Sequence, residues 1–365
     1  MSIETKITLI MAAGTGGHIL PALAVAQALQ KIGVTVHWLG TQQGLENQLV
    51  SPSGIFIHHL KMQGIRGKGL LALLMAPFRL GLATLQAIRI IHQIKPNIVL
   101  GFGGYVSAPG GLAAWILCKS LVLHEQNAIP GSSNRCLSRL AAQVFQAFPN
   151  TFPLSRKAIT CGNPIREEIL AISPPEQRFK IRRQEPNAPL RILILGGSQG
   201  AVWLNEIIPK TICQLPMGER PEIWHSAGQK QIDQTQARYE SLHISARVSG
   251  FITDMVQAYA WADLVICRAG ASTLAEIMAV GVASILIPYP HAIDDHQTKN
   301  ARYLSEQHAA IWIPQQQCNS VKLAACLSTF YHDKHQLFDI AMAARNLAMT
   351  DATPVMVKYC AAHFF

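Results

Sequence analysis

Two glycine-rich segments, each directly after an apolar run, carry the residues best suited to chemistry. The first joins residues 7–13 to Gly14-Thr15-Gly16-Gly17-His18, and the second joins residues 191–195 to Gly196-Gly197-Ser198-Gln199-Gly200-Ala201. Glycine turns let a phosphate approach the backbone closely, and a helix that follows offers unpaired N–H groups and the positive end of its dipole. Two such openings predict two Rossmann-like halves and an enzyme that joins two phosphate-bearing substrates.

The spacing of these glycines differs from that of a dinucleotide-binding turn. Such a turn needs G-x-G-x-x-G and an acidic residue at the end of the next strand. The third glycine position of the first loop holds Ile19, and the next apolar run ends Trp38-Leu39-Gly40-Thr41 without an acid. We therefore expect neither NAD nor FAD, and no other cofactor.

The elements that must position these loops alternate between short β-rich runs and helical patterns. This alternation is typical of parallel sheets covered by helices, and therefore of the α/β class. We predict strands at 34–39, 55–60, 97–101 and 120–124, and again at 191–195, 222–225, 246–249, 263–267 and 283–288. A polar segment at 173–189 is typical of an inter-domain connection, and we place the domain boundary near residue 166.

Composition narrows the functional classes. The 365 residues exceed what one core usually supports, and the formal charge of +10 favours nucleic acid, acidic lipid or phosphorylated substrates as partners. The eight cysteines contain no CxxC pair, which argues against zinc and against a disulfide framework. Because the N-terminus passes directly into the first strand, we expect no secretory leader.

Seven motifs in order along the chain resemble those of the MurG family of peptidoglycan glycosyltransferases. They are the first glycine loop with Pro21, Gly101-Phe102-Gly103-Gly104-Tyr105-Val106-Ser107, His124-Glu125-Gln126-Asn127, Gly162-Asn163-Pro164-Ile165-Arg166, the second glycine loop, residues 267–276 and residues 295–301. The resemblance implies the GT-B fold, with two Rossmann-like domains facing across a cleft. It assigns the acceptor to residues 1–166 with a C-terminal helix at 347–365, and the donor to residues 167–346.

The reaction that this resemblance implies is an inverting transfer of GlcNAc. UDP-GlcNAc would be the donor, and the 4-hydroxyl of MurNAc in undecaprenyl-linked lipid I would be the acceptor, which gives lipid II for peptidoglycan. The resemblance implies no metal and no nucleic acid as partner. The loop at 291–296 contains His and Asp side chains, but it lacks the regular helical spacing of metal ligands.

Glu276 has two interpretations. Thr273-x-x-Glu276 has the spacing of a capping box, in which the carboxylate only stabilises a helix start. The resemblance instead implies that Glu276 accepts hydrogen bonds from two ribose hydroxyls, and we adopt this role. Arg268 is either a counter-charge for phosphate or a structural ion-pair partner.

The remaining donor and acceptor residues follow from the resemblance alone. The donor set is Thr15, Gly16, Gly17, Asn127, Arg166, Ser198, Ile252, Ala271, Ser272, Thr273, Leu274, Ala275 and Gln297, with the Ile252 backbone reading uracil and Gln297 binding a GlcNAc hydroxyl. The pyrophosphate of the acceptor is assigned to Gly14, Gly103, Gly104 and Tyr105, with Thr15, Gly16 and Gly17 shared.

The transfer needs a general base for the acceptor hydroxyl. His18 ends the first glycine loop at a helix start and is the first candidate, although a histidine there could instead donate a hydrogen bond to phosphate. Glu125 and His124 are the alternative bases.

Residues 69–82 form an unusually apolar run flanked by basic residues. Pro77 and Arg79 interrupt it well short of the roughly 20 residues that span a bilayer. It is either a buried helix or an interfacial patch for an anionic membrane surface, comprising Leu70, Leu73, Leu74, Phe78 and Arg79. A lipid-linked acceptor favours the patch, and hence a peripheral location on the cytoplasmic face of the inner membrane.

Two other classes remain open. An epimerase or a glycolipid transferase that uses UDP-GlcNAc would need the donor half without this acceptor. A non-enzymatic membrane recruiter would keep the apolar and basic patch but would need no donor site.

Overall fold

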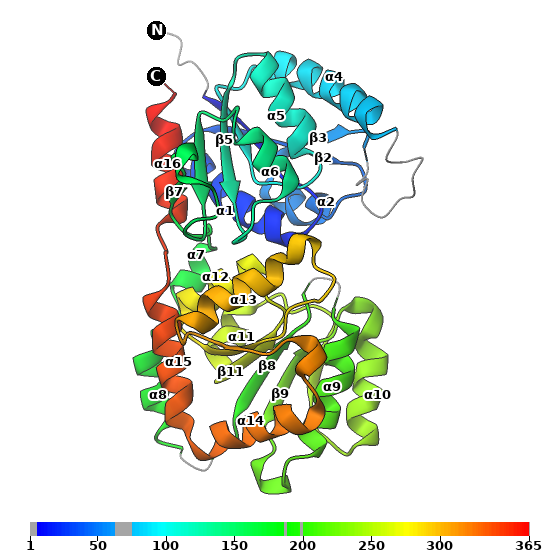
Figure 1. Ribbon diagram of the computed structural model, residues 1–365, viewed down its shortest axis with the longest axis vertical. Coiled ribbons are helices and arrows are strands. Elements are labelled where there is room, and N and C mark those ends of the chain that lie inside the picture. Colours follow the sequence, from blue (N-terminus) through cyan, green and yellow to red (C-terminus); the bar gives the residue numbers. More distant parts are fainter. Residues whose placement is uncertain (1–5, 63–74, 186–187, 198–199, 365) are drawn as a thin grey trace. The chain divides into compact units, whose positions relative to one another are not determined.

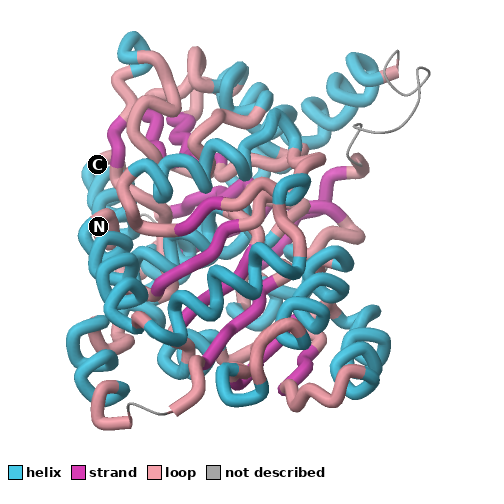
Figure 2. Tube along the Cα trace, turned by 60° about the horizontal axis from the view of Figure 1, so that its bottom comes forward, coloured by secondary structure: helices cyan, strands magenta, loops and turns pink. Residues whose placement is uncertain are grey.

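The computed structural model describes residues 6–62, 75–185, 188–197 and 200–364. The chain divides into unit 1, Met1–Arg166 with Met349–Phe365, and unit 2, Glu167–Ala348. Each unit contains its own parallel sheet (Figure 1), and Figure 2 shows strands lying between layers of helices. The predicted α/β class with two Rossmann-like domains is confirmed.

The sheet of unit 1 has the strand order β3-β2-β1-β4-β5-β6-β7, with parallel neighbours throughout. Its strands are β1 (Ile7–Met11), β2 (Thr35–Thr41), β3 (Phe56–Leu60), β4 (Ile98–Gly101), β5 (Ser120–Glu125), β6 (Gln143–Gln146) and β7 (Ile159–Thr160). The α-helices described in this unit are α1 (Gly16–Lys31), α2 (Glu46–Leu49), α4 (Ala76–Ile94), α5 (Ser107–Ile116), α6 (Ser132–Leu137) and α16 (Ala352–Ala362).

Strand β1 is apolar because both of its faces are covered. Ile10 belongs to the core on one face of the sheet, while Leu9 and Met11 belong to the core on the other face. Continuous apolar runs of this kind are typical of parallel strands between two helical layers. The same burial explains why residues 7–11 could be predicted as a strand.

Helix α16 closes unit 1 from the far end of the chain. Ala352, Met356 and Cys360 recur at a spacing of four, so they share one helix face, and all three are buried in the core of unit 1. Figure 1 shows α16 beside α1, and the two helices are in contact.

The sheet of unit 2 has the order β10-β9-β8-β11-β12-β13, again with parallel neighbours. Its strands are β8 (Arg191–Leu195), β9 (Glu222–Ser226), β10 (Arg247–Ser249), β11 (Leu264–Cys267), β12 (Ala283–Leu286) and β13 (Ile311–Trp312). The described α-helices are α7 (Glu167–Leu170), α8 (Pro175–Arg182), α9 (Val202–Cys213), α10 (Ile232–Ser241), α11 (Met255–Trp261), α12 (Ala271–Val280), α13 (His296–Glu306), α14 (Ser320–His332) and α15 (Lys334–Asn346).

The sequence predicts that the polar segment at 173–189 connects the two domains, and this prediction is wrong for most of the segment. It contains α8, which is part of unit 2. Arg178 donates to the Val280 carbonyl at 2.9 Å, and Arg182 forms two hydrogen bonds with the Asp263 carboxylate at 3.0 and 2.8 Å. The polar composition therefore reflects arginines that fix α8 to the rest of the unit.

Among the described residues, no helix is both long enough and apolar enough to cross a membrane.

Candidate functional site

Each sheet has a position where the strand order reverses, between β1 and β4 in unit 1 and between β8 and β11 in unit 2. Ligands of open α/β sheets bind beyond the carboxyl ends of the strands at such a position. The loops that follow these four strands, together with the first two turns of the helices after them, contain most of the described residues that the sequence predicted as functional.

In unit 1, the two loops that follow β1 and β4 pack together through glycines. Gly104 has a φ of +79°, and a Cβ there would overlap the carbonyl of Ala13. A Cβ at Gly103 would lie 2.6 Å from Cδ2 of His18. Side chains larger than glycine would therefore push these loops apart, which explains the Gly103-Gly104 pair on steric grounds.

His18 lies in the first turn of α1 and is partly exposed. Its Nδ1 atom is 3.1 Å from Oγ1 of Thr15. In the tautomer in which Nδ1 donates this hydrogen bond, Nε2 keeps its lone pair and can accept a proton. Thr15 thus supplies the orienting contact that a general base requires.

Glu125 is buried at the end of β5 and organises the following loop. Oε1 accepts from the backbone N–H and the side-chain amide of Asn127, at 3.1 and 3.2 Å. Oε2 accepts from the Gly131 N–H at 3.0 Å and from the Asn134 amide at 2.9 Å. Burial raises the pKa of Glu125, which these hydrogen bonds oppose. Asn134, which the sequence analysis missed, is thus part of the same network.

His124 is fully buried, and its Nε2 donates to the carbonyl of Gly162 at 2.9 Å. Burial lowers the pKa of His124 to about 4. With no exposed surface, this imidazole cannot reach a substrate hydroxyl without a rearrangement. The arrangement favours a structural role for His124 over that of a base.

In unit 2, helix α12 begins directly after the loop that follows β11. Gly270 is its N-cap residue without a side-chain cap, and the first turn contains no acidic residue. The first turn comprises Ala271, Ser272 and Thr273, and Leu274 and Ala275 follow it as buried residues. A helix N-terminus without its own carboxylate is suited to bind phosphate.

Glu276 lies in the second turn of α12, so the capping-box interpretation is wrong. That interpretation required Thr273 to be the N-cap, whereas the helix begins at Ala271. The Glu276 carboxylate instead accepts a hydrogen bond from the Tyr259 hydroxyl at 3.0 Å. Tyr259 is buried and was not predicted, because a contact between α11 and α12 leaves no spacing signal in the sequence.

Neighbouring loops of unit 2 are held by side chains from α13. Oε1 of Gln297 accepts from the Tyr289 N–H at 2.9 Å, and the Asn300 amide donates to the Ala269 carbonyl at 3.1 Å. Arg268 donates to the carbonyls of Ile287 and Pro288, at 3.0 and 3.2 Å. Neither of the roles expected for Arg268 describes these contacts, which are to backbone carbonyls.

The uracil-reading candidate lies in the loop before α11. The Ile252 side chain is buried, which leaves its backbone as the group that could contact a base. Asp254 caps α11 by accepting from the Gln257 N–H at 2.9 Å. Arg166 is partly exposed and is the last residue of unit 1 before α7.

Several predicted residues lie outside the described part of the chain. They are Ser198 of the second glycine loop and Leu70, Leu73 and Leu74 of the apolar run. Phe78 and Arg79 of that run are described, in the first turn of α4, and both are exposed.

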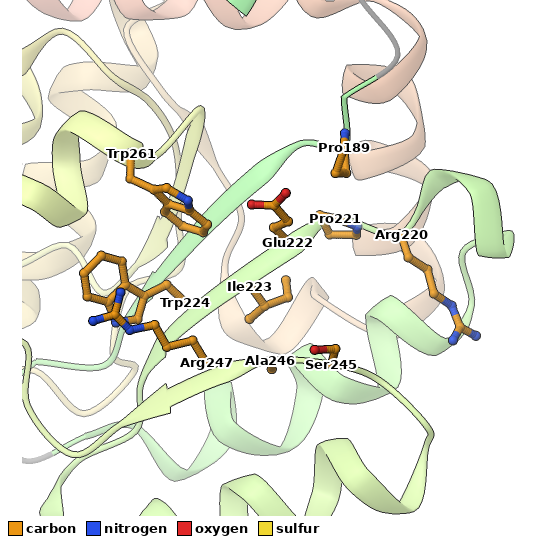
Figure 3. Close-up of a pocket in the computed structure, with 10 residues that line it drawn as sticks. All are labelled: Pro189, Arg220, Pro221, Glu222, Ile223, Trp224, Ser245, Ala246, Arg247 and Trp261. Carbon is orange, nitrogen blue, oxygen red and sulfur yellow. The ribbon is translucent and has the colours of Figure 1, made fainter. Parts of the chain in front are cut away.

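A pocket of about 370 Å³ in unit 2 lies away from these loops. Figure 3 shows Trp224, Trp261 and Arg247 on one side of it, where the Arg247 guanidinium is 3.6 Å from the Trp224 ring centroid. Pro189 lies two residues before the start of β8, and Glu222 is the first residue of β9. The pocket is therefore at the amino ends of the strands, the edge opposite to the glycine loop.

The described residues contain no group of three or more His, Cys, Asp or Glu side chains that could hold a metal ion.

Comparison with known proteins identifies the family. The sequence matches the Glycosyltransferase family 28 N-terminal domain over residues 8–146 and the Glycosyltransferase family 28 C-terminal domain over residues 191–354. The UDP-N-acetylglucosamine--N-acetylmuramyl-(pentapeptide) pyrophosphoryl-undecaprenol N-acetylglucosamine transferase of Pseudomonas putida is 49% identical over 99% of this chain and 98% of its own length. The Coxiella burnetii protein of the same name is 48% identical over 96% and 97%, respectively.

A solved structure agrees with these sequence matches. The crystal structure of Acinetobacter baumannii MurG superposes with a TM-score of 0.82 at 41% identity, over 98% of this chain and 99% of that one. The chain therefore belongs to glycosyltransferase family 28, within the group of N-acetylglucosamine transferases that includes MurG.

Proposed function

We propose that this protein transfers GlcNAc from UDP-GlcNAc to the MurNAc 4-hydroxyl of undecaprenyl-pyrophosphoryl-MurNAc-pentapeptide, forming lipid II. The observation that carries the proposal is the near-complete coverage of relatives whose name specifies this transfer, at almost half identity. The loops at both strand-order reversals support it, because each lies where open α/β sheets usually bind ligands.

Unit 2 binds the donor in this proposal. The N–H groups and dipole of α12 face the diphosphate, where they stabilise the negative charge that develops as UDP leaves. Glu276 pairs with the ribose hydroxyls while Tyr259 holds its carboxylate. The amide of Gln297, whose oxygen is bonded to the Tyr289 N–H, keeps its NH₂ group for a sugar hydroxyl.

Unit 1 binds the acceptor and supplies the base. Nε2 of His18 takes the proton of the acceptor hydroxyl as that oxygen attacks the anomeric carbon and the bond to UDP breaks. Glu125 shapes the loop that contains Asn127, because both of its oxygens already accept two hydrogen bonds from that loop and α6. Among the predicted bases, His18 is therefore the one that is both partly exposed and oriented by a hydrogen bond.

We also propose that the exposed face of α4 binds an anionic membrane surface. Phe78, Leu82 and Leu85 are 60%, 46% and 55% exposed and lie on one face of the helix, which also presents exposed Arg89. Exposed Trp115 belongs to α5, which packs against α4 (Figure 1). Apolar side chains beside basic ones suit a helix that lies in the membrane interface. In this proposal the enzyme works as a peripheral protein on the cytoplasmic face of the inner membrane, where its lipid-linked substrate would be anchored.

Transfer of radiolabelled GlcNAc to a short-chain lipid I analogue tests the proposal. We expect a labelled disaccharide-lipid product and stoichiometric release of UDP only when the acceptor is present. Release or epimerisation of the sugar without the acceptor would instead indicate the epimerase class. Vesicle sedimentation with and without anionic lipid tests the membrane surface separately.

A further inference from the structure

A buried carboxylate lies beside the loops of unit 1 and takes no part in the steps above. Glu46 begins α2, and its side chain is 0% exposed. Burial of a carboxylate costs free energy unless hydrogen bonds compensate for the lost water. Within the described residues, Oε2 of Glu46 has no hydrogen-bond partner. A buried carboxylate oxygen without a hydrogen-bond partner needs an explanation beyond packing.

Two glycines make the space that this carboxylate occupies. A Cβ at Gly44 would overlap both carboxylate oxygens, and a Cβ at Gly40 would lie 2.8 Å from Cγ of Glu46. The segment from the end of β2 to the start of α2 is therefore built around the carboxylate.

The hydrogen bonds of Glu46 have a fixed direction. Its Oε1 accepts from the Thr41 N–H at 2.7 Å and from the Thr41 hydroxyl at 2.9 Å. The Thr41 hydroxyl has a single hydrogen, which this second bond uses. Its oxygen is 3.2 Å from the Tyr105 hydroxyl, so Tyr105 must be the donor in that contact.

The phenol of Tyr105 therefore has no hydrogen left to donate to a ligand. Its oxygen can only accept, whereas its ring packs against the first glycine loop, since a Cβ at Gly14 would lie 3.5 Å from Cε1. A phosphate oxygen is also only an acceptor, so it makes a poor partner for this phenol. An amide N–H or a sugar hydroxyl is a suitable partner.

We infer that Glu46 is a positioning residue that, through Thr41, fixes Tyr105 as a hydrogen-bond acceptor and so selects a sugar hydroxyl or acetamido N–H of the acceptor. The inference rests on the proposed function, because it takes the unit 1 loops as the acceptor site. It assigns Tyr105 to the sugar of the acceptor, where the sequence analysis had assigned it to the pyrophosphate.

Substitution of the middle residue tests the inference with little change of shape. In Thr41→Val the hydroxyl is lost, and the Tyr105 hydroxyl becomes free to rotate and donate. We expect the KM for a lipid I analogue to rise about three- to tenfold, the range of one lost hydrogen bond, with little change in kcat or in UDP-GlcNAc affinity. Inhibition by geranyl pyrophosphate, which carries no sugar, should not weaken.

A double-mutant cycle and a conservative variant separate this role from a merely structural one. Tyr105→Phe should raise the acceptor KM similarly, and Thr41→Val should add little in that background. Glu46→Met should raise the KM as well, whereas Glu46→Gln, which keeps an acceptor oxygen toward Thr41, should restore most of the loss. Thr8→Val is the matched control, because Thr8 is buried on β1 and its hydroxyl has no partner among the described residues.

The outcomes are distinct. If the wild type fails to glycosylate the lipid I analogue, the proposed function fails and the inference fails with it. If the wild type is active but Thr41→Val has an unchanged acceptor KM, or its effect multiplies with that of Tyr105→Phe, the inference alone is overturned. Weaker inhibition by geranyl pyrophosphate in Thr41→Val would also overturn it, because Tyr105 would then serve the phosphate.

Discussion

The two units use the same scaffold in different ways at their strand-order reversals. In unit 1 the helix after the first glycine loop presents His18, a titratable side chain, in its first turn. In unit 2 the helix after β11 has no titratable side chain in its first turn and presents Glu276, held by Tyr259, in its second. The difference teaches that the same sheet edge can present a titratable side chain or a helix start without one, according to the residues in the first two helical turns.

The largest expected effect is on turnover and comes from a substitution of His18 in unit 1. We expect His18→Ala to lower kcat by about 10²–10⁴-fold, since this is the usual contribution of a general base. Affinity for UDP-GlcNAc, measured by calorimetry, should stay nearly constant. A variant that keeps kcat and raises only the acceptor KM would make His18 a binding residue.

Substitutions in the proposed donor site should instead weaken the binding of UDP-GlcNAc. Glu276→Ala should weaken UDP-GlcNAc binding by roughly 2–3 kcal/mol, because hydrogen bonds to a charged group are lost. Tyr259→Phe removes only the hydrogen bond that holds the carboxylate, so we expect a smaller loss of about 1 kcal/mol. Calorimetry on folded variants measures both losses. Equal affinities in wild type and Glu276→Ala would contradict the ribose role.

Acid should destabilise both units, because each sheet contains a buried histidine. Burial lowers the pKa of His124 to about 4 and that of His225 to about 3, below the usual 6.5. As pH falls from 6.5 toward 5, the unfolded chain gains these protons while the native units do not. Stability is therefore full above pH 6.5, and we expect each histidine to remove about 2 kcal/mol by pH 5. Urea unfolding at both pH values, with hydrogen exchange resolved by unit, measures this loss. An unchanged free energy of unfolding between these pH values would mean that His124 and His225 also bind protons in the native state.

The smallest effect concerns the exposed face of α4 in unit 1. Replacing Phe78 and Leu85 by Ser should weaken binding to anionic vesicles by about tenfold, since each side chain is only partly withdrawn from water at an interface. The melting temperature should not change, because both side chains are already exposed. Val321→Ser, at an exposed apolar position of unit 2, is the control. Equal vesicle binding by the wild type and both variants would contradict the proposal that α4 binds the membrane.

The sequence predicted the parts of the fold that depend on local patterns. Strands such as Arg191–Leu195 are continuously apolar and followed by glycine, so they could be located closely. Strand β6 (Gln143–Gln146) and the two-residue strands β7 and β13 were missed, because so few residues carry no clear periodic signal. Helix α8 was taken for a connection, because the arginines that anchor it are polar, and only their partners in unit 2 reveal the role.

In the candidate site, too, residues within sequence motifs could be predicted, whereas the residues that hold them by hydrogen bonds could not. Motif residues such as His18 and Glu276 could be chosen from the sequence, and their roles in catalysis and donor binding stay predictions. Tyr259, which holds the Glu276 carboxylate, and Asn134, which holds that of Glu125, each lie on an element near that of their partner along the chain. Hydrogen bonds of this kind depend on tertiary packing, so neither residue type nor spacing could indicate them.

The placement of α16 has a consequence for biosynthesis. Unit 2 is one continuous stretch, Glu167–Ala348, whereas unit 1 needs Ala352, Met356 and Cys360 from the end of the chain to complete its core. On the ribosome, the first half of the polypeptide emerges well before its last helix exists. Unit 2 can thus fold completely before the N-terminal segment of unit 1 has all of its core residues. Premature termination near residue 348 would leave the apolar residues that pack against α16 exposed on the N-terminal segment, where chaperones could bind them.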